Sequence, residues 1–280
     1  MNALEIKGLC KSYNNFELKD IDITLPSGYI MGLIGENGAG KSTLIKLIMG
    51  LIKSDQGSVT VLGRDNRKKF TVTKEDIGVV LDQPGFPSCL NAKQINKVMK
   101  LTYKNWDEPL YYGYIERFGI PKDKQFKDYS QGMRMKLGIA VALSHDPKLL
   151  ILDEATNGLD PVVRDDVNNI LNEFTRDETH SVLISSHIVS DLEKLCDYIA
   201  FLHKGQLLLC EEKDRLLEEF AFIQCSKEEL ERIPKSALRG VKRSVYNAEA
   251  VAERSALPKW IRSRPVTIEE LFVFMVKESV

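Results

Sequence analysis

The order of apolar and polar residues divides the chain into strand-like and helix-like segments. Near the start, apolar and polar residues alternate in LEIKGL (4–9) and KDIDITL (19–25), as in strands with one buried face. The apolar run GYIMGLIG (28–35) is typical of a strand buried on both faces. It leads into KSTLIKLIMG (41–50), which has helical spacing and ends on a glycine. This part of the chain therefore predicts strands followed by a helix.

The middle of the chain changes from strand-like to helix-like patterning. SVTVLG (58–63) and IGVVLDQ (77–83) predict two strands on either side of a basic loop. From residue 91 to 119 the alternation stops, and apolar residues lie at helical intervals among lysines. KDYSQGMRMKLGIAVAL (127–143) adds a basic and strongly helical run. We expect a helical subdomain over about residues 88–145, inserted between strands.

Strand signals return after this insertion. KLLILDE (148–154) and HSVLISS (180–186) predict strands, with a helix over residues 161–176 between them. A helix from residue 189 and the hairpin YIAFLHKGQLLL (198–209), turning at Lys204 and Gly205, follow. Strands that alternate with helices predict an α/β fold with a mainly parallel sheet.

The chain is long enough for one large domain with an appendage. We expect the large domain over residues 1–215 and a small C-terminal extension over 216–280. The extension follows the charged helix signal EEKDRLLEEF (211–220) and ends in the amphipathic TIEELFVFMVK (267–277). The residues between these two segments show a mixed pattern that predicts no regular element.

Composition excludes several classes of function. The formal net charge is −1, so no overall field attracts nucleic acid, and no nucleic-acid partner is expected. The N-terminus lacks a signal-peptide pattern, and no window reaches the about 18 apolar residues of a spanning helix, which predicts a cytosolic chain. The cysteines are scattered without metal-binding spacing and are expected to be free thiols rather than disulfides or zinc ligands.

GENGAGKST (35–43) matches the phosphate-binding pattern G-x-x-x-x-G-K-[ST]. It lies between a buried strand and a helix, where glycines allow backbone amides to converge on an anion and the helix N-terminus adds positive potential. Lys41 is expected to reach the β- and γ-phosphates of a nucleotide, and Ser42 to bind magnesium. The alternative is a glycine-rich turn with a chance lysine. The candidate nucleotide-binding residues are Gly35, Asn37, Gly38, Ala39, Gly40, Lys41, Ser42 and Thr43.

Two adjacent carboxylates follow the apolar run LLIL. Asp153 and Glu154 stand at the carboxyl end of a predicted strand, where open α/β sheets bind ligands. Asp153 would complete a magnesium site, and Glu154 would accept a proton from the attacking water or orient it. The alternative is a solvated strand end.

These motifs and five others occur in an order that resembles the ATP-binding cassette (ABC) family of ATPases. The series is Tyr13 in KSYNNF, GENGAGKST, Gln83 in VVLDQP, YSQGM, LLILDEAT, NGLDP and His187 in ISSHI. The resemblance covers about three quarters of the chain and implies a phosphate-loop nucleoside triphosphatase core with an antiparallel N-terminal portion. It implies ATP and Mg²⁺ as cofactors, and ATP hydrolysis as the activity.

YSQGM (129–133) resembles the family's signature motif, usually written LSGGQ. It keeps the serine and the second glycine, but Gln131 replaces the first glycine and Met133 the final glutamine. In the family this segment binds the γ-phosphate of an ATP held by a second subunit, so the resemblance implies a head-to-tail pair of cassettes, identical or related. Ser130, Gln131 and Gly132 are the candidates for that contact. The alternative is an ordinary amphipathic helix.

The resemblance assigns further residues to the same site. Tyr13 is expected to stack on adenine, Gln83 to contribute to the magnesium and catalytic site, and His187 to contact the γ-phosphate. Asp160 lies in NGLDP, which resembles the family's loop that couples the two sites across the interface.

The motifs are compatible with several processes that ATP hydrolysis could drive. The favoured hypothesis is the energy subunit of a transporter, at the cytoplasmic face of the membrane, whose membrane-spanning partner is a separate polypeptide. The motifs resemble cassettes of bacterial exporters of the ABC-2 type more than importers. A soluble cassette ATPase acting on ribosomes or DNA is the alternative, and a small-molecule phosphoryl transferase is a third. In QPGFPSCL (83–90), Phe86, Pro87 and Leu90 either contact the membrane partner or pack internally.

Overall fold

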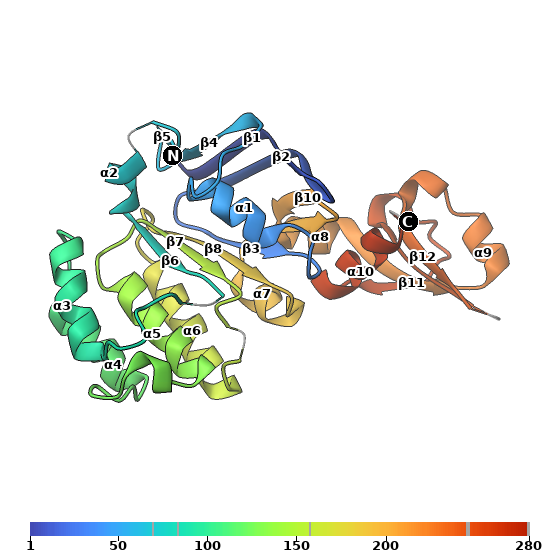
Figure 1. The fold of residues 1–280 in the computed structure, drawn as a ribbon. Coiled ribbons are helices and arrows are strands. Elements are labelled where there is room, and N and C mark those ends of the chain that lie inside the picture. Colours follow the sequence, from blue (N-terminus) through green and yellow to red (C-terminus); the bar gives the residue numbers. More distant parts are fainter. Residues whose placement is uncertain (69, 83, 157, 245–246, 279–280) are drawn as a thin grey trace.

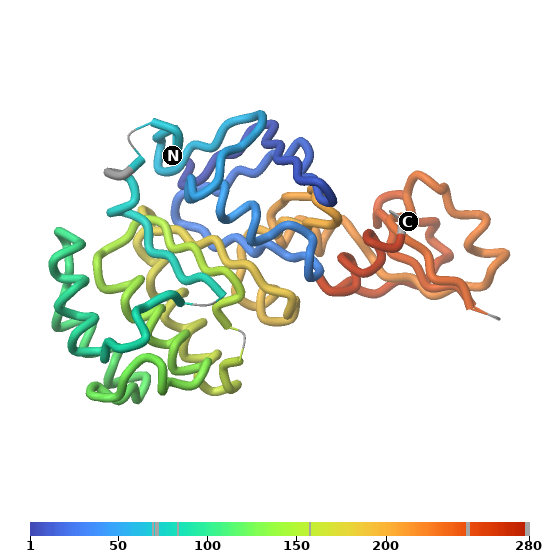
Figure 2. The backbone as a smooth tube through the Cα atoms, viewed as in Figure 1, coloured from blue at the N-terminus to red at the C-terminus, as the bar shows by residue number. Residues whose placement is uncertain are grey.

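The structure is a computed structural model that describes residues 1–68, 70–82, 84–156, 158–244 and 247–278. Figure 1 shows a larger part, built on one sheet with helices around it, and a smaller part to its right that carries α9, α10, β11 and β12. Figure 2 shows the same chain path, with the C-terminal residues in orange and red confined to the smaller part and to the junction.

The larger sheet has ten strands in the order β5-β4-β1-β2-β10-β9-β3-β8-β7-β6. Its first four strands form an antiparallel portion in which β1 pairs with both β2 and β4. These strands are β1 (Asn2–Tyr13), β2 (Phe16–Pro26), β4 (Gln56–Val61) and β5 (Arg64–Asp65).

The other half of the sheet is mainly parallel. Strand β3 lies between β8 and β9, β7 lies between β8 and β6, and all of these pairs are parallel. The predicted fold class is therefore confirmed. Because parallel strands end at one edge of a sheet, the loops that follow them meet there. The strands are β3 (Ile30–Ile34), β6 (Ile77–Val80), β7 (Leu149–Asp153), β8 (Ser181–Ser186), β9 (Tyr198–His203) and the antiparallel β10 (Gln206–Glu212).

The central strands separate two apolar cores. In β7, Leu150 and Leu152 face the core that contains residues of α5 (Gln131–Leu143) and α6 (Pro161–Phe174). Leu149 and Ile151 face the opposite core, which contains residues of α1 (Lys41–Ile48). Burial on both faces explains why this strand is uniformly apolar in sequence.

A group of helices follows β6, as the helical spacing predicted. It contains α3 (Ala92–Thr102), α4 (Glu108–Arg117), a 3₁₀ turn (Phe126–Asp128) and α5. Asn91 and Gln94 form a capping box at the start of α3, and Asp107 caps α4 by accepting from the Leu110 amide. The fully buried Tyr111 donates its hydroxyl to the Ala92 carbonyl at 3.0 Å and ties α4 to α3.

Two short helices flank the parallel strands. The helix α2 (Phe70–Lys74), which follows the basic loop, was not predicted. The predicted helix after residue 189 is α7 (Val189–Leu195), which follows β8 and packs beside β3.

The C-terminal residues form a second sheet that the sequence did not indicate. Its order is β12-β13-β11-β14, and all of its pairs are antiparallel. Its small side chains explain the missed prediction, because Ala248, Ala250 and Ala252 of β13 are fully buried without giving a strong apolar signal. The elements are α8 (Lys213–Glu219), β11 (Phe220–Cys225), α9 (Lys227–Glu231), β12 (Leu238–Arg243), β13 (Ala248–Glu253), β14 (Ser263–Pro265) and α10 (Ile268–Glu278), with 3₁₀ turns at Lys235–Ala237 and Arg254–Ala256.

The helix α10 joins the second sheet to the larger part. It packs on β12, where a Cβ at Gly240 would lie 2.1 Å from the Phe274 carbonyl oxygen, so only glycine allows this approach. On the other side the ring of Phe272 meets that of Phe201 in β9 edge-on, at a centroid distance of 5.1 Å. Among the described residues, no helix is both long and apolar enough to cross a membrane.

Candidate nucleotide site

The glycine-rich loop between β3 and α1 is held close to its neighbours. At Gly40 the backbone is left-handed (φ 111°), and a Cβ there would lie 2.7 Å from Phe16 Cζ. A Cβ at Gly35 would lie 2.5 Å from the Leu202 carbonyl oxygen. Both positions therefore require glycine. Gly40 also precedes α1 without a side-chain cap, so the first amides of this helix remain available to an anion.

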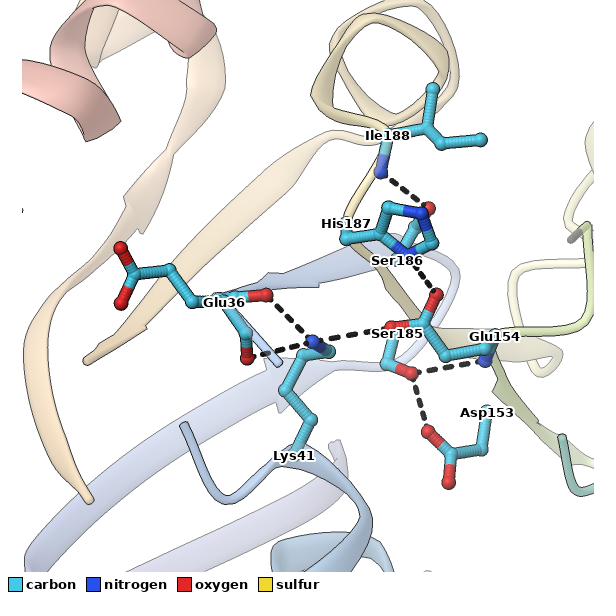
Figure 3. Close-up of polar contacts among 9 residues, drawn as sticks. Glu36, Lys41, Asp153, Glu154, Ser185, Ser186, His187 and Ile188 are labelled. Carbon is cyan, nitrogen blue, oxygen red and sulfur yellow. Dashed lines mark hydrogen bonds and ion pairs between the residues drawn. The ribbon is translucent and has the colours of Figure 1, made fainter. Parts of the chain in front are cut away.

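Lys41 is the first residue of α1, and its side chain is only 6% exposed. Its ammonium donates to the carbonyl oxygens of Gly35 (2.6 Å) and Glu36 (3.3 Å) and lies 3.1 Å from Glu154 Oε1. Figure 3 shows the lysine pointing into this group of acceptors. The loop thus wraps its backbone around the positive charge of the Lys41 ammonium.

Glu154 links Lys41 to His187. Its second oxygen, Oε2, lies 2.9 Å from His187 Nδ1 (Figure 3). Burial of the carboxylate acts to raise its pKa, but the charge of Lys41 and the contacts with His187 outweigh burial, and the pKa of Glu154 is lowered. The carboxylate is therefore ionised at neutral pH and available to accept a proton.

The backbone at Glu154 is left-handed (φ 53°), which is uncommon for a residue with a side chain. Its amide donates to Ser185 at both the hydroxyl (3.1 Å) and the carbonyl oxygen (3.1 Å). These two bonds hold a turn that aims the carboxylate at Lys41. Ser185 was not among the predicted site residues.

Asp153 is almost fully buried and accepts a hydrogen bond from Ser185 Oγ at 2.6 Å. The pairing follows from strand register, since Asp153 and Ser185 are partners in β7 and β8. Ser185 therefore positions both predicted acidic residues. The polar SS at the end of VLISS is the signal that could have identified it.

A cavity of about 730 Å³ opens above these groups. Most of its lining comes from the predicted loop, from Glu154 and from His187, while Ala39 is buried away from it. Four lining residues were not predicted, namely Asn15, Phe16, Glu36 and Asp82. The lining residues are Asn15, Phe16, Glu36, Asn37, Gly38, Gly40, Lys41, Ser42, Thr43, Asp82, Glu154 and His187.

Tyr13 does not line this cavity. Its side chain is exposed and lies under the ammonium of Lys11, at 5.5 Å from the ring centroid. Phe16, its antiparallel partner at the end of the β1–β2 hairpin, provides the aromatic wall instead. Stacking of Tyr13 on adenine therefore stays a prediction, and Phe16 is a second aromatic candidate.

The signature-like residues lie outside this cavity. Ser130 is exposed and caps α5 by accepting from the Met133 amide at 3.3 Å. Gln131 rests against Gly158, with 3.4 Å between its Cδ and a Cβ placed on that glycine, and Asp160 caps α6 through the Val163 amide. None of these three residues lines the cavity around the chain's own phosphate loop.

Gln83 lies outside the described residues. Of the neighbouring apolar residues, Phe86 packs edge-on against Phe126 at a centroid distance of 5.5 Å, and Leu90 packs against the same core. Internal packing thus explains these two, whereas Pro87 is exposed. A second cavity, of about 530 Å³, lies between this segment and α5. It is lined by Asp82, Pro84, Gly85, Tyr129, Gln131 and Arg134.

The donor atoms suit a magnesium ion that is completed by phosphate. Among the described residues, no group of three or more His, Cys, Asp and Glu could hold a metal on its own. Ser42 and Asp153 nevertheless offer a hydroxyl and a carboxylate, and Mg²⁺ is commonly held by one or two protein oxygens together with substrate phosphates.

Comparison with known proteins gives the same family. The family model described as ABC transporter matches residues 18–157. The uncharacterized ABC transporter ATP-binding protein YdbJ of Bacillus subtilis is 38% identical over 73% of this chain and 67% of its own length. The lantibiotic transport ATP-binding protein SrtF of Streptococcus pyogenes is 37% identical over 75% of this chain and 91% of its own length. The ABC transporter ATP-binding protein YtrB of Bacillus subtilis is 29% identical over 96% of this chain and 97% of its own length. This match includes C-terminal residues that follow the larger sheet.

Solved structures agree in fold. The ATP-binding subunit of an ABC transporter superposes with a TM-score of 0.70 at 26% identity, covering 76% of this chain and 91% of its own. The cassette MJ0796, in a dimeric post-hydrolysis state with ADP and Pi, superposes with a TM-score of 0.68 at 18% identity. This match covers 75% of this chain and 98% of MJ0796. The chain belongs to the ABC transporter family and is one of its ATP-binding subunits.

Proposed function

We propose that this ABC ATPase binds Mg²⁺-ATP in the 730 Å³ cavity, hydrolyses it with Glu154 as the base, and thereby drives a separate membrane-spanning subunit of an exporter. The observation that carries the proposal is the convergence of a phosphate-loop lysine and a strand-end carboxylate within 3.1 Å at the floor of that cavity. A structural glycine-rich turn has no need of such a pair.

Binding of ATP would exchange the partner of Lys41. The ammonium is shared between Glu154 and two loop carbonyls. The γ-phosphate carries more negative charge than one carboxylate, and the uncapped start of α1 supplies amides directed at it. The lysine can then turn to the phosphates and leave Glu154 with His187.

Ser42 and Asp153 would hold the magnesium ion, with Gln83 as the predicted third contributor. When bound, magnesium neutralises charge on the phosphate oxygens. Asp153 is kept in place for this task by the bond from Ser185 Oγ, which leaves its other carboxylate oxygen for the metal.

Glu154 can accept the proton of the attacking water because its carboxylate is ionised and its backbone amide is held by two hydrogen bonds to Ser185. His187 Nδ1 holds the same carboxylate, and its half-exposed ring reaches the cavity where a γ-phosphate would lie. Proton acceptance by Glu154 and contact of His187 with the terminal phosphate would then occur side by side.

A second cassette would complete the pocket. Ser130, Gln131 and Gly132 are displayed at the start of α5 and do not line their own chain's cavity, so we propose that they contact ATP held by a partner in a head-to-tail pair. Asp160 would lie at the same interface. MJ0796, whose fold is similar, was solved as a dimer.

The proposed task is export at the cytoplasmic face of the membrane. Relatives of this chain are named for the transport of lantibiotics and bacitracin. A helix of the membrane partner would dock at the 530 Å³ cavity, where Tyr129 and Arg134 line the wall and the exposed Pro87 lies nearby in the chain. No observation favours action on ribosomes or nucleic acid.

Size-exclusion chromatography with light scattering tests this proposal. The Glu154→Gln protein should elute as a dimer with Mg²⁺-ATP and as a monomer with ADP. Ser130→Arg in the same background should bind ATP but stay monomeric, because a large cation occupies the contact for the partner's phosphate. A dimer that persists in Ser130→Arg would contradict the head-to-tail arrangement. Copurification with ribosomes instead of a hydrophobic membrane protein would contradict the transport role.

A further inference from the structure

His203 ends β9 directly beneath the phosphate loop. The strand pairs with β3, and the turn that follows it donates from the Gly205 amide to the Ala39 carbonyl at 3.0 Å. Together with the close approach of the Leu202 carbonyl to Gly35, this bond clamps the end of β9 against the loop. The imidazole of His203 is consequently buried, at 4% exposure, and does not line the nucleotide cavity.

This buried imidazole lies close to one charged group of the loop. Nδ1 of His203 is 3.2 Å from Oε2 of Glu36. The contact is not aligned as a hydrogen bond, and within the described part of the chain neither ring nitrogen makes one. A buried polar group without a hydrogen bond is costly, and a small rotation of the Glu36 side chain would supply one. The pair therefore favours a conformation in which Glu36 stays near His203.

Glu36 occupies a sensitive position. It lines the nucleotide cavity, its carbonyl oxygen accepts from Lys41, and its carboxylate points away from that lysine in Figure 3. The side chain is 53% exposed, so packing alone does not fix it. A carboxylate that turned into the cavity would repel the phosphates and compete for Lys41.

We propose that His203 is a positioning residue that keeps the Glu36 carboxylate out of the phosphate-binding cavity and so strengthens ATP binding. This inference rests on the proposed use of that cavity for ATP. The effect depends on the negative charge of Glu36. A purely structural role of the buried imidazole would not depend on it.

The dependence on the negative charge of Glu36 can be tested by measuring nucleotide binding. Binding of a fluorescent ATP analogue is measured with Mg²⁺ chelated, so that hydrolysis does not consume the ligand. His203→Asn should weaken binding about tenfold relative to wild type, and Glu36→Gln serves as the reference for a loop without this negative charge. The double variant should bind within about twofold of Glu36→Gln, because no charge is left to repel the phosphates. Equal weakening of His203→Asn and the double variant, or no weakening of His203→Asn, would overturn the inference.

A surface variant tests the same idea without changing the buried residue. Glu36→Asp keeps the charge but is one methylene too short to stay at His203, so it should weaken binding as His203→Asn does, whereas Glu36→Gln does not. Equal binding by Glu36→Asp and Glu36→Gln would refute the inference even if His203→Asn failed to fold. Lys41→Ala, which lacks the ammonium of the phosphate loop, serves as the control for loss of nucleotide binding. If the wild-type protein bound no ATP even with Mg²⁺ present, the proposed function itself would fail.

Discussion

Lys41 and Glu154 form an ion pair, with 3.1 Å between Nζ and Oε1 and exposed side-chain fractions of 6% and 11%. Two nearly buried charges of opposite sign stabilise each other only while both are present. A phosphate that binds Lys41 must therefore compete with Glu154 for the ammonium.

Glu154→Gln should leave ATP binding close to wild type and slow ATP turnover by roughly 100-fold or more, because proton acceptance is lost while the phosphate loop is unchanged. Steady-state phosphate release and equilibrium nucleotide binding measure the two effects. Glu173→Gln makes the same change at an exposed position of α6 and should have no effect on either. Normal turnover by Glu154→Gln would show that another group is the base.

Lys41→Met should weaken ATP binding and also destabilise the empty protein, by about 1–3 kcal/mol, since the nearly buried Glu154 carboxylate loses its cation. Urea unfolding without nucleotide measures the second effect. Lys46→Met changes an exposed lysine of the same helix and serves as the control. Addition of Glu154→Gln to Lys41→Met should restore part of the lost stability. A double variant no more stable than Lys41→Met would argue against the ion pair.

The ionisation of Glu154 predicts a pH dependence of stability. Its folded-state pKa is lowered from 4.5, because Lys41 and His187 together outweigh burial. The carboxylate therefore contributes stability above the unfolded pKa, and this contribution is lost as the pH falls through the lower folded pKa. The difference in unfolding free energy between wild type and Glu154→Gln should be constant near neutral pH and shrink below 4.5. A difference that grew on acidification would reverse the sign of the shift.

Two glycines predict opposite effects of one added methyl group. Gly240→Ala should destabilise the protein by about 1–3 kcal/mol, because the new Cβ would lie 2.1 Å from the Phe274 carbonyl oxygen. Gly113→Ala, in the exposed middle of α4 with no atom near the new methyl group, should stabilise it by about 0.5–1 kcal/mol. Urea unfolding compares the two. Equal stability of both variants would mean that α10 is not held against β12 as described.

The local parts of the site could be predicted from sequence. The phosphate loop and the Asp153–Glu154 pair are contiguous segments that follow apolar strands, so the fold delivers them to one sheet edge. Ser185 and Phe16 were missed because their roles depend on strand pairing, of Ser185 with Asp153 and of Phe16 with Tyr13. Pairing register is a tertiary property that alternation alone does not determine.

The fold of the first three quarters followed from periodicity, whereas the second sheet did not. Strands such as AEAVAE in β13 bury alanines, whose small apolar area gives little contrast with their neighbours. The position of His203 was likewise hidden, since one histidine after YIAFL carries no signal of the loop that lies above it.

The contact of Phe272 with Phe201 links assembly of the central sheet to chain synthesis. Strand β9 leaves the ribosome well before α10, which cannot cover Phe201 until the second sheet has been made. During that interval the edge-on contact of Phe272 on the Phe201 ring is still missing, so this part of the core is completed late in synthesis. A truncation before α10 would remove this contact for good and lower the stability of the whole ATPase.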